Sequence, residues 1–256
     1  MNFKRILEHD ILDHTFSSAF TLGGVSFAVS KHLLAMWAAC ALLVLMFVYL
    51  RAARGATAGR LRLLLEVFIL YIRDEIVLSS MGERGRKYLH YFLTLFFFIL
   101  ACNLLGLVPG SATATGNIAV TAALSLCTFF LIHIAGAREQ GLARYVKSIV
   151  PSGLPGWLVP LMFPIELLGF FTKTFALSIR LFMNMIAGHI VVLAFLCLIF
   201  IFSAIHPWVG IVTAPVSVSM SLFVYFLELL IVIPLQAYIF TFLTALFVGA
   251  AVHPEH

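Results

Sequence analysis

Two long apolar stretches in the second half of the chain restrict its fold more than any other feature. Residues 158–202 and 208–252 carry few polar side chains, and a short His-Pro-Trp turn separates them. An upright helix crosses a bilayer core with about 20 residues, and each stretch is about twice that length. As a single helix, each would reach roughly 65 Å. Each stretch therefore either divides into two spans or forms one arm of a strongly tilted hairpin.

The composition indicates an integral membrane protein without a separate soluble domain. Of the 256 residues, 62% are hydrophobic and 11% are charged, whereas a soluble domain carries about 25% charged residues. The net charge of +5 does not predict nucleic-acid binding. The basic residues lie between apolar runs, where they report membrane topology instead.

Shorter segments complete the predicted architecture, an all-α membrane fold of about five crossing helices. Residues 33–50, 88–108 and 118–135 are each apolar enough for one span, and the last two would form a hairpin. In residues 57–81, apolar side chains recur between charges at helical spacing. That pattern predicts an amphipathic helix on the membrane surface.

Lysine and arginine counts predict the orientation of the chain. The connections after the first and third spans are basic, whereas the loop after the second span and the turn between the long stretches contain neither residue. Basic loops face the cytoplasm in multi-pass proteins. We therefore expect the N-terminal segment 1–32 on the outer side and the C-terminus in the cytoplasm.

Arg180 is the polar residue that most requires an explanation, because it lies deep inside the first long stretch. A charge near the bilayer centre costs a few kcal/mol and usually serves an ion path, a counter-charge or a substrate site. At about 100° per residue, Lys173, Glu166 and Asn184 fall within roughly 40° of Arg180 on the helix surface. His189 points to the opposite side. The helix thus presents a polar stripe to one neighbour and an imidazole to another.

Several of these residues also fit a purely structural interpretation. Glu166 and Lys173 fit interfacial side chains that reach toward water. Asn184 fits a hydrogen bond to a packed neighbour, and His189 fits packing within a bundle. Arg180 differs because it stays charged and lies too deep to reach water easily.

The second long stretch supplies the complementary polar groups, Glu228 and Gln236. A buried carboxylate near a buried imidazole makes a titratable pair that can pass protons. Antiparallel packing would bring Glu228 near His189, because the two lie at similar distances from the intervening turn. The alternative for Glu228 is a structural ion pair with a cation.

Four segments carry a resemblance to subunit a of F-type rotary ATP synthases over nearly the full chain. They are GRKYLHYFLTLFFFILACNLLGLVPG, TATGNIAVTAALSL, LSIRLFMNMIAGHIV and LQAYIFTFLTALFV. The resemblance implies a stator subunit of a bacterial plasma membrane, with two tilted helices curving against a ring of c subunits. It also implies a b-type peripheral stalk, the remainder of the synthase and membrane lipid as partners, and no cofactor, metal or nucleic acid.

The resemblance also assigns roles to individual residues. Arg180 matches the arginine that faces the ring's ion-carrying carboxylate, and Asn184 matches the polar residue one turn on. His189 and Glu228 resemble the outer-side access pair, with the two residue types exchanged relative to some bacterial members. Gln236 matches the glutamine that approaches the arginine.

Two further positions and one difference in spacing follow from the same resemblance. Glu166 and Lys173 match polar positions nearer the cytoplasmic end of the arginine helix. The spacing from Glu228 to Gln236 is eight residues, where the family has seven, and Pro234 lies between them. A local bulge or kink would absorb the extra residue.

The expected function is coupling of transmembrane proton flow to ring rotation and ATP synthesis through two aqueous half-channels. The chain itself would be non-catalytic, without an ATP site. One alternative is a Na⁺-translocating version of the same subunit. Another is a secondary transporter with an anionic-substrate site at Arg180, although the internal repeats of such proteins are not evident. An intramembrane hydrolase is disfavoured, since the sequence has no GxSxG and no HExxH.

Overall fold

Long apolar helices dominate the structure, a computed structural model that describes residues 15–22, 25–53, 55–108, 113–149 and 158–252. Five helices of this described part are long and apolar enough to cross a membrane: Lys31–Ala52, Thr57–Gly106, Ile118–Gln140, Val159–Ile205 and Trp208–Val252. The chain is therefore an all-α membrane protein, which confirms the predicted fold class.

A small β-hairpin precedes the first helix and was not predicted. β1 (Thr15–Leu22) pairs antiparallel with β2 (Val25–Ser30). α2 (Lys31–Ala52) follows directly, and the Ser30 hydroxyl accepts a hydrogen bond from the amide of Leu33 at 3.3 Å. This side chain caps the helix, because it satisfies an amide that has no partner within the first turn. The outer-side placement of 1–32 stays a prediction, and residues 1–14 lie outside the described part.

The helical run Thr57–Gly106 folds back on itself. It consists of α3 (Ala56–Tyr71), the π-helical segment η1 (Ile72–Leu78), α4 (Ser79–Met81), the 3-10 segment η2 (Gly82–Tyr88) and α5 (Leu89–Gly106). Gly82 has φ of 60°, a left-handed value that glycine adopts without a side-chain clash. The rings of Phe68 and Phe96 lie 6.1 Å apart, so α3 packs beside α5. Placement of residues 57–81 on the membrane surface stays a prediction.

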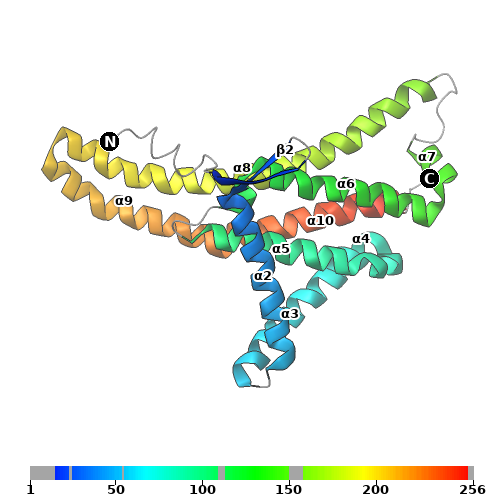
Figure 1. The fold of residues 1–256 in the computed structure, drawn as a ribbon, viewed down its shortest axis with the longest axis horizontal. Helices are drawn as coiled ribbons and strands as arrows, with labels where there is room; N and C mark the ends of the chain where they lie inside the picture. Colours follow the sequence, from blue (N-terminus) through cyan, green and yellow to red (C-terminus); the bar gives the residue numbers. More distant parts are fainter. Residues whose placement is uncertain (1–14, 23–24, 54, 109–112, 150–157, 253–256) are drawn as a thin grey trace. The chain divides into compact units, whose positions relative to one another are not determined.

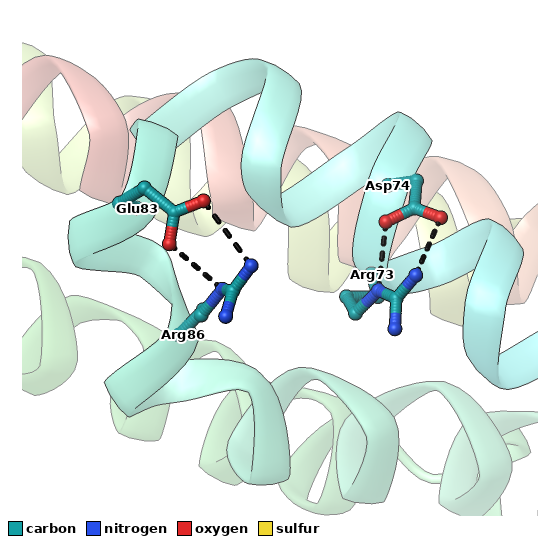
Figure 2. A network of polar contacts seen from close by, with 4 residues as sticks. All are labelled: Arg73, Asp74, Glu83 and Arg86. Atoms are coloured by element: carbon teal, nitrogen blue, oxygen red, sulfur yellow. Dashed lines mark hydrogen bonds and ion pairs between the residues drawn. The ribbon is translucent and has the colours of Figure 1, made fainter.

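Two exposed ion pairs flank this reversal (Figure 2). The Arg73 guanidinium donates to both carboxylate oxygens of Asp74, at 2.7 and 2.9 Å. Arg86 contacts both oxygens of Glu83, at 2.8 and 3.2 Å. Because exposed pairs contribute only about 0–1 kcal/mol each, the reversal rests mainly on Gly82 and on apolar packing.

The described chain divides into two compact units, and α8 (Val159–Ile205) contributes to both. The first unit comprises the described residues of Met1–Leu42, Ile99–Ile118 and Leu181–Gln236. Within it, the C-terminal part of α8 lies beside α9 (Pro207–Leu227), drawn in yellow and orange in Figure 1. Gly210 of α9 packs against Ser203 of α8. The two helices are therefore an antiparallel hairpin.

The second unit comprises the described residues of Leu43–Phe98, Ala119–Arg180 and Ala237–His256. α6 (Ile118–Gln140) packs along the first part of α8, where the Ser178 hydroxyl donates to Thr121 Oγ1 at 3.1 Å. The end of α6 meets the end of α10 (Ile233–Val252), where Gln140 Nε2 donates to the Ala251 carbonyl at 2.6 Å. These contacts bury one polar group against another, as a membrane interior requires.

A short helix, α7 (Leu142–Ser148), closes the second unit beside α6. Its Tyr145 packs so closely on Gly136 that no side chain would fit there. Burial raises the pKa of Tyr145, so its hydroxyl stays protonated and shares a hydrogen bond of 2.7 Å with His133 Nδ1.

The two long apolar stretches differ in their regularity. α8 is one continuous helix of 47 residues, so the first stretch does not divide into two spans. The second contains α9, the π-helical segment η4 (Glu228–Val232) and α10. Pro234 explains η4, because proline clashes with the carbonyl four residues earlier and a wider turn relieves that clash. The predicted bulge between Glu228 and Gln236 is therefore confirmed, and its π-turn absorbs one extra residue.

Candidate functional site

Arg180 lies on the uncovered face of α8. Its side chain is exposed, as are those of Lys173, Ala176, Met183 and Ala187, which recur every three or four residues along one side of the helix. The opposite side is buried in the chain through Thr174, Leu177, Ser178, Leu181 and Met185. We call the exposed row the arginine face; its two alanines allow another helix to approach closely.

The arginine face gives Arg180 no counter-charge within the described part of the chain. The ion pairs found there join Arg73 to Asp74, Arg86 to Glu83 and Lys87 to Glu139. A charged group in a membrane is costly unless it is paired or hydrated. The chain therefore leaves Arg180 available for a carboxylate outside these residues.

Lys173 and Glu166 occupy the earlier part of α8. The Lys173 ammonium lies 5.3 Å from the ring centre of Phe170 and 6.0 Å from that of Phe247. Both distances permit cation–π attraction, so two aromatic rings hold this side chain beside α10. Glu166 is half-buried. Their placement by the resemblance, near the cytoplasmic end, stays a prediction.

His189 contacts the segment that leads into α6. Its Nε2 lies 3.0 Å from the hydroxyl of Thr113, and the ring is half-buried. The hydrogen bond to Thr113 therefore gives the His189 ring a defined partner. Asn184, five residues earlier on α8, is also half-buried.

Glu228 is buried against the backbone of α8. The residue is 3% exposed, and a Cβ added to Gly188 would overlap its carboxylate, with Cδ only 2.5 Å away. Gly188 directly precedes His189 in α8, so the Glu228 carboxylate packs on the residue next to the histidine. Only glycine at position 188 leaves room for the carboxylate in this place.

Replacement of Gly188 by alanine is predicted to displace Glu228 and to impair the protein. The overlapping atoms are the flexible end of the Glu228 side chain, so the carboxylate moves while the backbone of α8 stays in place. We expect reduced ion flux in vesicles, with little change in the thermal stability of the assembled complex. Gly169→Ala, on the same helix, is the matched control, because a Cβ there meets nothing within 4 Å. Equal behaviour of the two variants would contradict this packing.

Gln236 is buried near the start of α10, with 6% of its surface exposed. Its Nε2 has no hydrogen-bond partner among the described residues. A buried amide without a partner costs about 1–3 kcal/mol. This donor is therefore suited to a group outside the described residues.

Comparison with known proteins decides the family. Residues 33–249 match the family model described as ATP synthase A chain. The chain belongs to this family. It is 44% identical to ATP synthase subunit a of Myxococcus xanthus over 91% of its own length and 76% of that protein. It is 41% identical to subunit a of Chloroherpeton thalassium, over 92% of its length and 70% of that protein.

Membership in the ATP synthase A chain family makes the chain a multi-pass membrane subunit of an F-type ATP synthase. It is also 39% identical to subunit a of Pelodictyon phaeoclathratiforme, over 98% of the chain and 77% of that protein. The resemblance to subunit a that the sequence indicated is thus confirmed. The roles of the individual site residues stay predictions.

Two parts of the site were missed by sequence reasoning. The first is Gly188, which makes room for Glu228; the Ala-Gly-His order gave a signal, since glycine is often retained where two elements approach closely. The second is the contact of Thr113 with His189, 76 residues apart. No local pattern could have indicated that pairing.

Proposed function

We propose that this member of the ATP synthase A chain family is the ion-conducting stator, working against a ring of c subunits. Ions enter an outer half-channel past Glu228, His189 and Asn184 and neutralise a ring carboxylate. The neutral site then moves into lipid, which a charged site could not do cheaply. It releases its ion into a second half-channel that opens to the cytoplasm.

The observation that supports this proposal most strongly is the arginine face. Arg180 is exposed there beside Ala176 and Ala187, without an ion pair in the described part of the chain. A fixed positive charge lowers the pKa of an approaching carboxylate and favours loss of its ion. Because the ion is lost near Arg180, a ring carboxylate that still carries its ion does not pass directly from one half-channel to the other.

Gln236 and Lys173 support the same arrangement. The Gln236 amide has an unused donor that fits a ring carboxylate or a water molecule beside it. Two rings hold the Lys173 ammonium on the arginine face, two turns before Arg180. Its charge favours a negatively charged partner over the face.

The proposed ion is the proton, since Glu228 and His189 are titratable groups at one level of the first unit. The membrane potential supplies about 2.3 kcal/mol per charge for each 100 mV, so several protons are needed per ATP.

The N-terminus would be outside and the C-terminus inside a bacterial plasma membrane, with a b-type stalk holding the subunit against the ring.

Purified synthase in Na⁺-free vesicles tests the choice of ion. We expect ATP hydrolysis to acidify the lumen and a protonophore to abolish the gradient. An absolute requirement for Na⁺, with no acidification in its absence, would assign the Na⁺-translocating alternative. ATP hydrolysis that moves neither ion, in a complex that contains the ring, would overturn the proposed function.

A further inference from the structure

Thr113 is contacted by two histidines from different helices. His32, in the first turn of α2, places Nδ1 2.7 Å from the Thr113 carbonyl oxygen, and His189 of α8 places Nε2 3.0 Å from the Thr113 hydroxyl. His32 is 7% exposed and Thr113 is 6% exposed. A buried backbone carbonyl and a buried hydroxyl of one residue thus connect two imidazoles.

The carbonyl oxygen fixes the direction of one hydrogen bond. It can only accept, so His32 Nδ1 carries the proton and donates. The Thr113 hydroxyl, which also lies 3.4 Å from the carbonyl of Gly106, can either donate to or accept from His189 Nε2. It therefore serves both the bare and the protonated form of this nitrogen.

Close packing holds Thr113 in this position. A Cβ added to Gly106 would lie 2.5 Å from both Cγ2 and Oγ1 of Thr113, and 2.6 Å from Cε of Met185. Two residues further on, the Thr115 hydroxyl donates to Asn103 Oδ1 at 2.7 Å. The segment is therefore tied to α5 at Thr113 itself and again at Thr115.

We propose that Thr113 is a positioning residue for His189, and that His32 holds Thr113 in place. This inference rests on the proposed function, in which His189 lies on the outer half-channel. Neutral His189 takes up the translocated proton and becomes an imidazolium, whose Nε2–H donates to the Thr113 hydroxyl. His189 is neutral again when a proton leaves the ring. The hydrogen bond at Nε2 persists throughout, so the ring need not turn in each cycle.

Variants of Thr113 test its hydrogen bond to His189 with little change in the shape of the side chain. Thr113→Val removes the hydroxyl, whereas Thr113→Ser keeps it. Loss of one hydrogen bond corresponds to roughly 2- to 10-fold in rate. We expect Thr113→Val to lower proton flux per assembled complex by that factor and Thr113→Ser to retain most of the flux. Equal flux in the two variants would overturn the role of the hydroxyl.

Variants of His32 separate positioning from proton carriage. In His32→Asn the side-chain amide can still donate to the Thr113 carbonyl, whereas His32→Leu cannot. We expect His32→Asn to retain flux and His32→Leu to lose it, and the exposed His90→Leu to act as the matched control. Equal loss in His32→Asn and His32→Leu, or loss in neither, would overturn the positioning role.

Glu228→Gln, measured in the same vesicles, separates failure of this inference from failure of the proposed function. If Glu228→Gln lowers flux while the Thr113 and His32 variants behave like wild type, only the positioning role is wrong. If none of the variants changes flux, the outer half-channel itself is misplaced. The amount of assembled complex, quantified by its ATP hydrolysis and subunit content, normalises every value.

Discussion

Arg180→Ala is expected to abolish ATP-driven ion pumping while the complex still assembles. An opposite charge nearby lowers the pKa of a carboxylate by about 1–3 units, so its loss slows ion release from the ring roughly 10- to 1000-fold. Because Arg180 is exposed on α8 and has no ion pair within the described residues, its removal leaves no buried group unpaired. Acidification of vesicles by ATP hydrolysis measures the effect.

Two controls accompany this variant. Arg144→Ala removes an exposed arginine of α7 and should leave pumping unchanged. Passive proton leak should rise or stay equal in Arg180→Ala, since the fixed charge between the half-channels is gone. Normal pumping by Arg180→Ala would refute the role of the arginine face.

Glu228→Gln is expected to reduce proton flux by at least about tenfold, because positioned proton-transfer groups typically contribute about 10²- to 10⁴-fold in rate. The replacement keeps the shape that packs on Gly188 and removes the exchangeable proton. Passive flux through complexes lacking the peripheral ATPase measures the effect directly. Glu75→Gln, at an exposed carboxylate of η1, is the control. Unchanged flux in Glu228→Gln would remove this residue from the outer half-channel.

The Glu228 region also shows how far sequence reasoning reached. The eight-residue spacing to Gln236 and the intervening Pro234 predicted a bulge, and the structure has a π-helical segment there. That inference succeeded because proline imposes a local steric requirement that does not depend on distant residues. The sequence left open whether residues 158–202 form one helix or two spans, and the structure has the single helix α8.

Contacts between distant segments were not predictable in the same way. His32 reaches the Thr113 carbonyl across 81 residues, and the direction of a side chain over such a separation depends on how helices pack. The pairing of β1 with β2 was also missed, because residues 1–32 were predicted only as an outer-side segment. Pairing of short strands depends strongly on its context.

In the proposed function, the arginine face meets the ion-carrying carboxylate of a c subunit. Disulfide formation tests it most directly, in a synthase whose native Cys40, Cys102, Cys127 and Cys197 are replaced. Ala176→Cys, exposed one turn before Arg180, is paired with a cysteine placed beside the ring carboxylate. Leu177→Cys, 2% exposed and packed against the rest of the chain, is the control.

We expect oxidation to join the Ala176→Cys variant to the ring and to stop ATP-driven pumping, and a reductant to reverse both effects. The Leu177→Cys variant should remain unlinked and active. Linkage through Leu177→Cys with none through Ala176→Cys would contradict the account, because the ring would then contact a different side of the helix.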